Sequence, residues 1–194
     1  MKSSIKLSVV TLALLTIATL TTKAQDTTPS SKSTTTGSGI RLSVGPEVGV
    51  PVGSFHDAYN WNLGGSIQAD FPIVSEKLYV TVNAGYNNFF AKDNGGVTAS
   101  DLQLIPVKAG LKYYPVSNFY VQGEAGAAFL TNKDKVGADK SASFVYAPQV
   151  GYVFKLSSNN YIDAGVRFES NTKFTDNGSS SNFFGLRVAY AFGL

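Results

Sequence analysis

Residues 160–171 read Asn160-Tyr-Ile-Asp-Ala-Gly-Val-Arg-Phe-Glu-Ser-Asn171, and their pattern decides the fold. Apolar residues recur at every second position from Ile162 onward, whereas the positions between them include Asp163, Arg167 and Glu169. A period of two is the period of a β-strand, whose side chains point alternately to its two faces. One face of this strand is therefore apolar, and the other is charged.

The same alternation continues through the chain from residue 39 to the end. Breaks rich in turn residues divide this part into eight runs: 39–50, 60–71, 78–90, 102–114, 119–131, 143–155, 160–171 and 182–194. Strands of soluble proteins are usually about 5–6 residues long. A tilted strand that crosses a membrane needs about 9–11 residues. The length of the runs therefore favours strands that span a membrane.

The polar face of these runs combines charged residues with glycine. Its charged residues are Arg41, Glu47, Asp70, Lys108, Lys112, Glu124, Lys155, Asp163, Arg167, Glu169 and Arg187. Its glycines are Gly45, Gly49, Gly64, Gly85, Gly110, Gly126, Gly151, Gly165, Gly185 and Gly193. A soluble β-sandwich or lipocalin-like barrel would turn this face to water, where strands usually avoid glycine. A narrow lumen needs small residues beside long charged ones, so the pattern favours a membrane barrel that is polar inside.

The apolar face carries aromatic residues near both ends of the runs. Trp61, Tyr86, Phe129, Phe144 and Phe168 form one level, and Phe71, Tyr113, Phe119, Phe154 and Phe192 form the other. Two aromatic girdles are typical of barrels whose ends lie at the two membrane–water interfaces.

The connections between runs alternate in length. Those at 72–77, 115–118 and 156–159 are short, whereas those at 51–59, 91–101, 132–142 and 172–181 are long and polar. Bacterial barrels have short periplasmic turns and longer extracellular loops. We therefore predict an all-β protein, an eight-stranded antiparallel up-and-down transmembrane β-barrel over residues 39–194. Both ends of this barrel are expected in the periplasm.

Two segments precede the barrel. Residues 1–24 have a basic start with Lys2 and Lys6, an apolar run and small residues before a cut at Gln25, which predicts a cleaved signal peptide. The apolar run is shorter than the roughly 20 residues that a spanning helix needs. Nine of the fourteen residues in 25–38 are Ser or Thr, which predicts a short, flexible, disordered leader.

Composition excludes several functional classes. The formal net charge is +3, but Lys2, Lys6 and Lys23 supply all of it. The chain has sixteen Lys and Arg residues, and the thirteen that remain balance its thirteen acids. A basic nucleic-acid surface is therefore not expected. The absence of cysteine excludes disulfides and thiol chemistry, and the single histidine, His56, excludes a site with several histidines. No cofactor motif or metal motif is present.

Three stretches carry a resemblance to a known family. They are Gly45-Pro-Glu-Val-Gly-Val-Pro-Val-Gly-Ser-Phe55, Asn62-Leu-Gly-Gly-Ser-Ile-Gln-Ala-Asp-Phe71 and Leu186-Arg-Val-Ala-Tyr-Ala-Phe-Gly-Leu194. With them, residues 39–194 resemble the small outer-membrane β-barrel family of Gram-negative bacteria, which includes OmpX-like, OmpA-like and porin-family barrels. The resemblance implies an outer-membrane location, contact with outer-membrane lipid and lipopolysaccharide, and insertion by the barrel-assembly machinery. Alternating aromatics at the C-terminus resemble the signal that this machinery recognises.

The lumen is the candidate site. An eight-stranded barrel is just wide enough for side chains to fill it. Unpaired charges are costly at low dielectric, so the six bases and five acids of the polar face are expected to pair across the lumen as a structural plug. Pro46, Pro106 and Pro148 fall inside strands and lack a ladder donor, so bulges or register shifts are expected there.

Three functions remain open. The first is a non-enzymatic, monomeric envelope protein that stabilises the outer membrane or presents loops for adhesion or ligand contact. The second is a narrow porin-like or transport-associated channel. The third is a lipid-modifying enzyme, for which Ser54, His56 and Asp57 are candidate residues in the first long loop. The loops also carry candidate cation ligands (Asp93, Asp101, Asp134, Asp139, Asp176) and candidate partners for lipopolysaccharide phosphates (Lys92, Lys133, Lys135, Lys140, Lys173).

Overall fold

The computed structural model describes residues 39–74, 77–94, 97–98, 100–175 and 178–194. The predicted signal peptide (1–24) and leader (25–38) lie outside these residues. The long strands are β1 (Arg41–Val52), β2 (Tyr59–Val74), β3 (Leu78–Ala91), β6 (Leu102–Tyr113), β7 (Phe119–Leu130), β8 (Ala142–Lys155), β9 (Asn160–Asn171) and β10 (Ser181–Gly193). The shorter elements are helices α2 (Ser54–Ala58) and α3 (Lys133–Val136) and the hairpin strands β4 (Asp93–Asn94) and β5 (Val97–Thr98).

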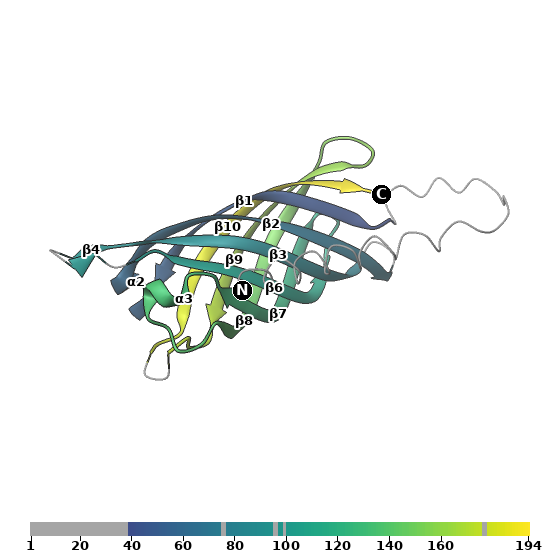
Figure 1. Cartoon of the computed structure of the whole chain (residues 1–194). Coiled ribbons are helices and arrows are strands. Elements are labelled where there is room, and N and C mark those ends of the chain that lie inside the picture. The colour runs from purple at the N-terminus through teal and green to yellow at the C-terminus, as the bar shows by residue number, and fades with distance from the viewer. Residues whose placement is uncertain (1–38, 75–76, 95–96, 99, 176–177) are drawn as a thin grey trace, which may run out of the picture. The chain divides into compact units, whose positions relative to one another are not determined.

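The long strands close into a barrel, as the sequence predicts (Figure 1). Each strand pairs antiparallel with the next long strand along the chain, and β10 returns to pair with β1. The eight predicted runs coincide with the eight strands, although β2 continues to Val74 and β1 continues to Val52. The register between β2 and β3 shifts at Tyr59/Trp61 and at Pro72/Val74, which are the two ends of β2.

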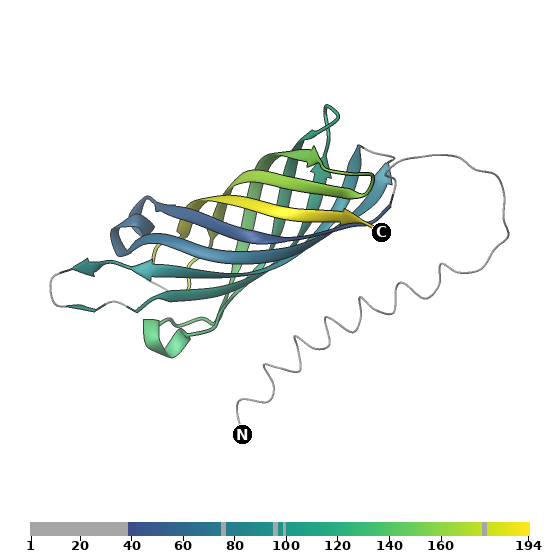
Figure 2. The same ribbon diagram turned by 90° about the horizontal axis from the view of Figure 1, so that it is seen from above.

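The two ends of the barrel differ. Helices α2 and α3 and the β4–β5 hairpin gather at one end, which we term the loop end, and the C-terminus lies at the other, the turn end (Figures 1 and 2). At the turn end, the Leu194 amide donates a hydrogen bond to the Ile40 carbonyl at 2.9 Å. Both ends of the barrel domain therefore meet at the turn end, as the even strand number predicts.

The outward face of the barrel is apolar. Ile67, Phe144 and Leu186 have exposed fractions of 51%, 54% and 46%, which no soluble sheet would show over a whole face. Trp61 and Phe90 stack at 4.5 Å between ring centroids in the girdle near the loop end. The described helices include none that is long and apolar enough to cross a membrane.

The in-strand prolines interrupt pairing but do not shift it, so the expected register shifts are wrong at these positions. Beside Pro46, β1 and β10 pair at Val44↔Tyr190 and resume in the same register at Glu47↔Arg187. The other neighbour, β2, pairs through Pro46 without a break. Pro106 and Pro148 behave alike, with a gap on one side only. A missing N–H removes a hydrogen bond to one neighbour, and the ladder on the other side keeps the strand in place.

Candidate functional site

The inward face of the barrel forms three layers. A chain of ion pairs fills the middle, an apolar cluster fills the loop end, and a group of tyrosines with Arg41 fills the turn end. Alternation along each strand places these side chains inside, because every second residue points away from lipid. We describe the layers in turn.

The middle layer, which we name the charge chain, runs through six residues: Glu124, Lys108, Glu169, Arg167, Glu47 and Arg187. Lys108 Nζ lies 2.6 Å from Glu169 Oε2 and 3.8 Å from Glu124 Oε2. Arg167 contacts Glu169 through Nε at 3.5 Å and binds Glu47 directly. Arg187 Nε lies 3.4 Å from Glu47 Oε1.

Acids and bases alternate along the charge chain, and each of its side chains is buried. A buried charge is costly unless it is paired and hydrogen-bonded. Supporting polar groups complete the layer: Ser66 donates a hydrogen bond to Glu47, and Thr81 Oγ1 donates to Glu124 Oε1 at 3.1 Å. The charge chain as a whole is neutral, and its six residues pair with one another across the lumen.

A second charged group lies below the charge chain, toward the turn end. Lys112 Nζ bridges Asp70 Oδ2 at 3.0 Å and Asp163 Oδ2 at 2.7 Å. The Tyr120 hydroxyl donates to Asp163 Oδ1 at 2.6 Å and accepts from Gln149 Nε2 at 2.7 Å. This group has two acids and one base, so it carries one net negative charge by itself.

Arg41 binds tyrosines, and the described ion pairs do not include it. The Tyr79 hydroxyl accepts from Arg41 Nη2 at 2.5 Å, and the Tyr114 hydroxyl accepts from Nη1 at 3.1 Å. The expectation that Arg41 pairs with an acid is therefore corrected: its strand partner Asp70 is already bound by Lys112. Burial raises the pKa of Tyr114, which lies in the turn after β6, so this hydroxyl stays protonated.

Lys155 does not belong to the lumen network, which corrects the prediction. It is the last residue of β8, and its side chain is exposed at the turn end. Alternation assigns Lys155 to the inward face, but at the mouth of the barrel that face opens to water. Without Lys155, the lumen holds five bases (Arg41, Lys108, Lys112, Arg167, Arg187) and five acids (Glu47, Asp70, Glu124, Asp163, Glu169).

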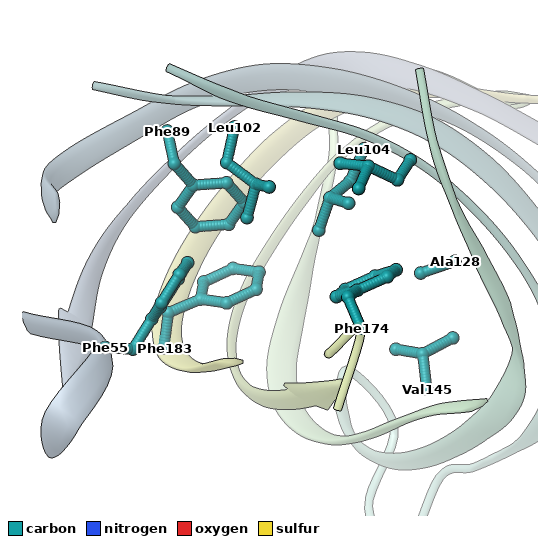
Figure 3. Packing of buried hydrophobic residues seen from close by; sticks show 9 residues of the cluster. Phe55, Phe89, Leu102, Leu104, Ala128, Val145, Phe174 and Phe183 are labelled. Carbon is teal, nitrogen blue, oxygen red and sulfur yellow. The ribbon is translucent and has the colours of Figure 1, made fainter. Parts of the chain in front are cut away.

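The apolar cluster at the loop end is absent from the sequence-based prediction. It consists of Phe55, Phe89, Leu102, Leu104, Ala128, Leu130, Val145, Phe174 and Phe183 (Figure 3). Ring centroids of Phe89 lie 5.0 Å from those of Phe55 and Phe183. Phe55 comes from α2 and Phe174 from the β9–β10 connection, so two connections fold back over the lumen.

A signal for this cluster exists in the sequence. Phe89-Phe90 and Phe183-Phe184 are doublets in which both faces of the strand become apolar. The structure places Phe89 and Phe183 inside, and it leaves Phe184 53% exposed on the outward face. A break in the alternation near a strand end thus marks where the lumen changes from polar to apolar.

The candidate enzyme residues do not form a triad in the structure. Ser54, His56 and Asp57 lie on or beside one turn of α2 with exposed side chains, and the described hydrogen bonds include none between them. Asp101 is a structural brace at the loop end, accepting from Asn88 Nδ2 at 3.1 Å and from the Ala91 amide at 3.0 Å. The described residues contain no group of three or more His, Asp or Glu side chains placed to hold a metal ion.

The described lysines and aspartates of the other long loops lie at the loop end. Lys133 Nζ donates to the Asp139 carbonyl at 2.8 Å, which ties α3 to the end of its own loop. The Lys140 amide donates to the Phe174 carbonyl at 2.9 Å, which joins the β7–β8 and β9–β10 connections. Asp176 lies outside the described residues. Lys135, Lys140 and Lys173 are exposed on these two joined connections.

Comparison with solved structures identifies the same architecture. No protein-family model and no curated protein matches the sequence. OprG from Pseudomonas aeruginosa is 12% identical, with 81% of this chain and 96% of that one covered and a TM-score of 0.53. AlkL in lipid bilayers is 16% identical, covering 88% and 98%, with a TM-score of 0.52. The attachment invasion locus protein Ail of Yersinia pestis, in complex with the heparin analogue sucrose octasulfate, is 16% identical, covering 80% and 100%, with a TM-score of 0.51.

These proteins are outer-membrane barrels, and this chain covers 96–100% of each of them. At such low identity they establish the fold and nothing finer. The outward apolar face, the girdles and the closed polar interior agree with that fold. The chain is an eight-stranded transmembrane β-barrel with the fold of the small bacterial outer-membrane proteins.

Proposed function

We propose that this protein is a closed, non-enzymatic outer-membrane barrel that stabilises the envelope and offers its loops for contact outside the cell. The observation that carries the proposal is the continuous filling of the lumen. An ion entering at the loop end meets packed aromatic rings, then the neutral charge chain, then Arg41 among the tyrosines. Each layer is held by contacts of its own, so opening a path requires breaking several of them together.

We assign the proposed contacts with lipopolysaccharide, with other surfaces and with the assembly machinery to the loops and to the outward face of the barrel. The exposed lysines on the joined loops (Lys135, Lys140, Lys173) suit lipopolysaccharide phosphates. The fold of Ail, an attachment protein, supports loop contact as a role that such a barrel can carry. We infer insertion by the assembly machinery through β10, whose outward residues include Tyr190 and Phe192. A monomer is the simplest assembly, since the closed barrel leaves no strand edge to pair.

One observation favours the alternative function, a narrow channel. Arg167 Nη1 and Arg187 Nη1 are buried and have no hydrogen-bond partner among the described residues. Two unsatisfied donors at mid-lumen could be solvated by water or by a passing anion. The two functions differ in a property that can be measured directly.

Recordings in planar bilayers test the closed barrel. We expect the purified protein to show no stable openings at high salt and at either polarity. Glu124→Ala and Lys108→Ala, which each remove one member of the charge chain, are expected to leave the protein closed, because the layers above and below remain. Reproducible openings whose size changes in these variants would establish the channel function instead.

Two cellular experiments test the rest of the proposal. A strain lacking the protein should become more permeable to detergents and large antibiotics, and the wild-type gene should restore the barrier. Complementation by a variant with Lys135, Lys140 and Lys173 replaced by Gln reports on the loops. Lipid analysis of a His56→Ala strain tests the enzyme hypothesis, since an altered lipid pattern would contradict a non-enzymatic role.

A further inference from the structure

At the turn end of the lumen, three tyrosine rings surround the Arg41 guanidinium. The guanidinium carbon of Arg41 lies 4.6 Å from the ring centroid of Tyr79, 5.5 Å from that of Tyr114 and 5.4 Å from that of Tyr161. A cation within about 6 Å of an aromatic face is attracted by the ring quadrupole. Three strands or turns thus present rings to one cationic group, an arrangement that we term the tyrosine cage (Tyr79, Tyr114, Tyr161).

The cage binds Arg41 in two ways. Tyr79 and Tyr114 accept hydrogen bonds from the two terminal nitrogens, whereas the Tyr161 hydroxyl turns away and contacts the Ser158 carbonyl at 3.4 Å. Tyr161 therefore offers Arg41 only its ring. Arg41 Nε is buried and has no hydrogen-bond partner among the described residues. The rings and two hydroxyl groups therefore hold the Arg41 guanidinium, and the described ion pairs give it no carboxylate partner.

Local charge also favours a cation in this place. Asp70 on β2 pairs in register with Arg41, and Lys112 on β6 binds both Asp70 and Asp163 on β9. Lys112 neutralises one of the two acids, so this group carries one net negative charge without Arg41. The rings of Tyr114 and Tyr120 add negative faces, with Lys112 Nζ 4.2 Å from the Tyr120 centroid. Removing Arg41 would leave an aromatic cage with a negative surrounding.

We propose that the tyrosine cage is a binding site for cations of the guanidinium and quaternary ammonium class, and that Arg41 occupies it as an internal ligand that seals the turn end. Arg41 is only partly buried, so the cage lies within reach of the mouth. This site goes beyond the proposed function, because it exists whether or not the barrel conducts. A free cation reaches the cage only when Arg41 is absent or displaced.

The test uses Arg41→Ala in the full mature chain, folded in detergent micelles, with n-propylguanidinium and tetramethylammonium as probes. Without a probe, the variant should unfold at a lower urea concentration than wild type. Millimolar probe should raise the variant's midpoint toward the wild-type value, with a saturable dependence, because a ligand that binds only the folded state stabilises it. Wild type should not respond, since its cage is occupied. Sodium at equal ionic strength should have no effect on either protein.

Two control variants isolate the cage from charge alone. Lys155→Ala removes an exposed positive charge at the same end and should not respond to the probes. Arg41→Ala combined with Tyr161→Leu removes one ring of the cage. This double variant should bind both probes several-fold more weakly, and the loss would report the ring face alone, because the Tyr161 hydroxyl makes no hydrogen bond to Arg41. Equal midpoint shifts in wild type and Arg41→Ala, or no shift in Arg41→Ala, would overturn the proposal.

A second measurement does not need the Arg41→Ala variant to fold. Nitrogen-15 labelling of arginine allows hydrogen exchange at Arg41 Nε to be followed by NMR. We expect slow exchange in wild type and at least severalfold faster exchange in Tyr161→Leu, with no change in Tyr146→Leu, whose ring is 43% exposed on the outward face. Wild-type exchange as fast as that of free arginine would show an open cage and contradict the proposal.

Discussion

At the scale of single residues, glycine makes room for the large side chains of the lumen. The Tyr120 ring lies against Gly151 on β8 and Gly165 on β9. A Cβ at Gly151 would come within 2.3 Å of the Tyr120 ring, and one at Gly165 within 2.6 Å of its hydroxyl. Both distances are shorter than any tolerated contact, so the two glycines allow Tyr120 to reach Asp163 and Gln149.

This packing makes a prediction for Gly151→Ala. The new methyl group has to push the Tyr120 ring away from Asp163, and overpacking of this kind costs about 1–3 kcal/mol. Urea unfolding of the barrel in lipid vesicles measures the change. Gly123→Ala is the matched control, because nothing lies within 4 Å of its Cβ position, and it should be nearly neutral. Equal stability of the two variants would contradict the packing described for Tyr120.

A second prediction at this scale concerns Arg167→Leu. The substitution leaves Glu47 with Arg187 as its only cationic partner and Glu169 with Lys108 as its only one, inside a buried layer. Breaking a buried pair by removing one partner costs about 3–5 kcal/mol. Lys155→Leu should change stability by no more than about 0.5 kcal/mol, as at other exposed positions. Comparable losses in the two variants would mean that Arg167 is as solvated as Lys155.

At the scale of the element, each strand has an inward face, a lipid face and a depth. Leu186 lies in the middle of β10, between Val48 and Val166 on the neighbouring strands. Val80 is the third residue of β3 and pairs with Phe71, which belongs to the girdle at the turn end. The two residues share the lipid face, but only Leu186 lies far from both interfaces.

Depth leads to different expectations for Leu186→Arg and Val80→Arg. Arginine on the lipid face costs about 2–4 kcal/mol near the midplane and about 0–1 kcal/mol near an interface. Leu186→Arg should therefore destabilise the barrel strongly, whereas Val80→Arg should be tolerated. Reversible unfolding from lipid vesicles gives both values. A neutral Leu186→Arg in a protein that remains soluble without detergent would show that the face is not in lipid.

At the scale of the whole molecule, the barrel exists only if β1 and β10 close it. Their seam passes Pro46, where pairing is interrupted, and Gly45, whose Cβ would lie 2.1 Å from the Val188 carbonyl oxygen and 2.4 Å from the Ala189 Cα. These are backbone atoms, so no side-chain rotation can relieve the contact. Gly45 therefore allows the first and last strands to approach at their weakest point.

We expect Gly45→Val to loosen this seam before any other strand pair. Amide hydrogen exchange should become faster in β1 and β10 while β6 and β7 keep their protection. Gly123→Val, at an open position on the lipid face, should leave the seam as it is in wild type. Uniformly faster exchange around the barrel would mean that closure is not the local weak point.

The sequence by itself determined the strand number, the connection lengths and the face of nearly every strand residue. Alternation of apolar and polar residues is local, and a strand obeys it whatever its neighbours are. For the same reason the inward charges from Glu47 to Arg187 were predictable as lumen residues. The near equality of acids and bases among them was also predictable, apart from Lys155, since an unpaired charge in so narrow an interior carries a large desolvation cost.

Only the tertiary structure decided which inward residues meet. Alternation specifies a face but not a depth, and the stagger between strands brings residues of different strands to one level. That stagger brings Arg41 to tyrosines on β3 and β9. It leaves Lys155 exposed at the end of β8, outside the filled part of the lumen. The seal at the loop end likewise depends on Phe55 and Phe174, which lie in connections outside the periodic pattern. Their position follows from the apolar ring that the folded barrel presents to them.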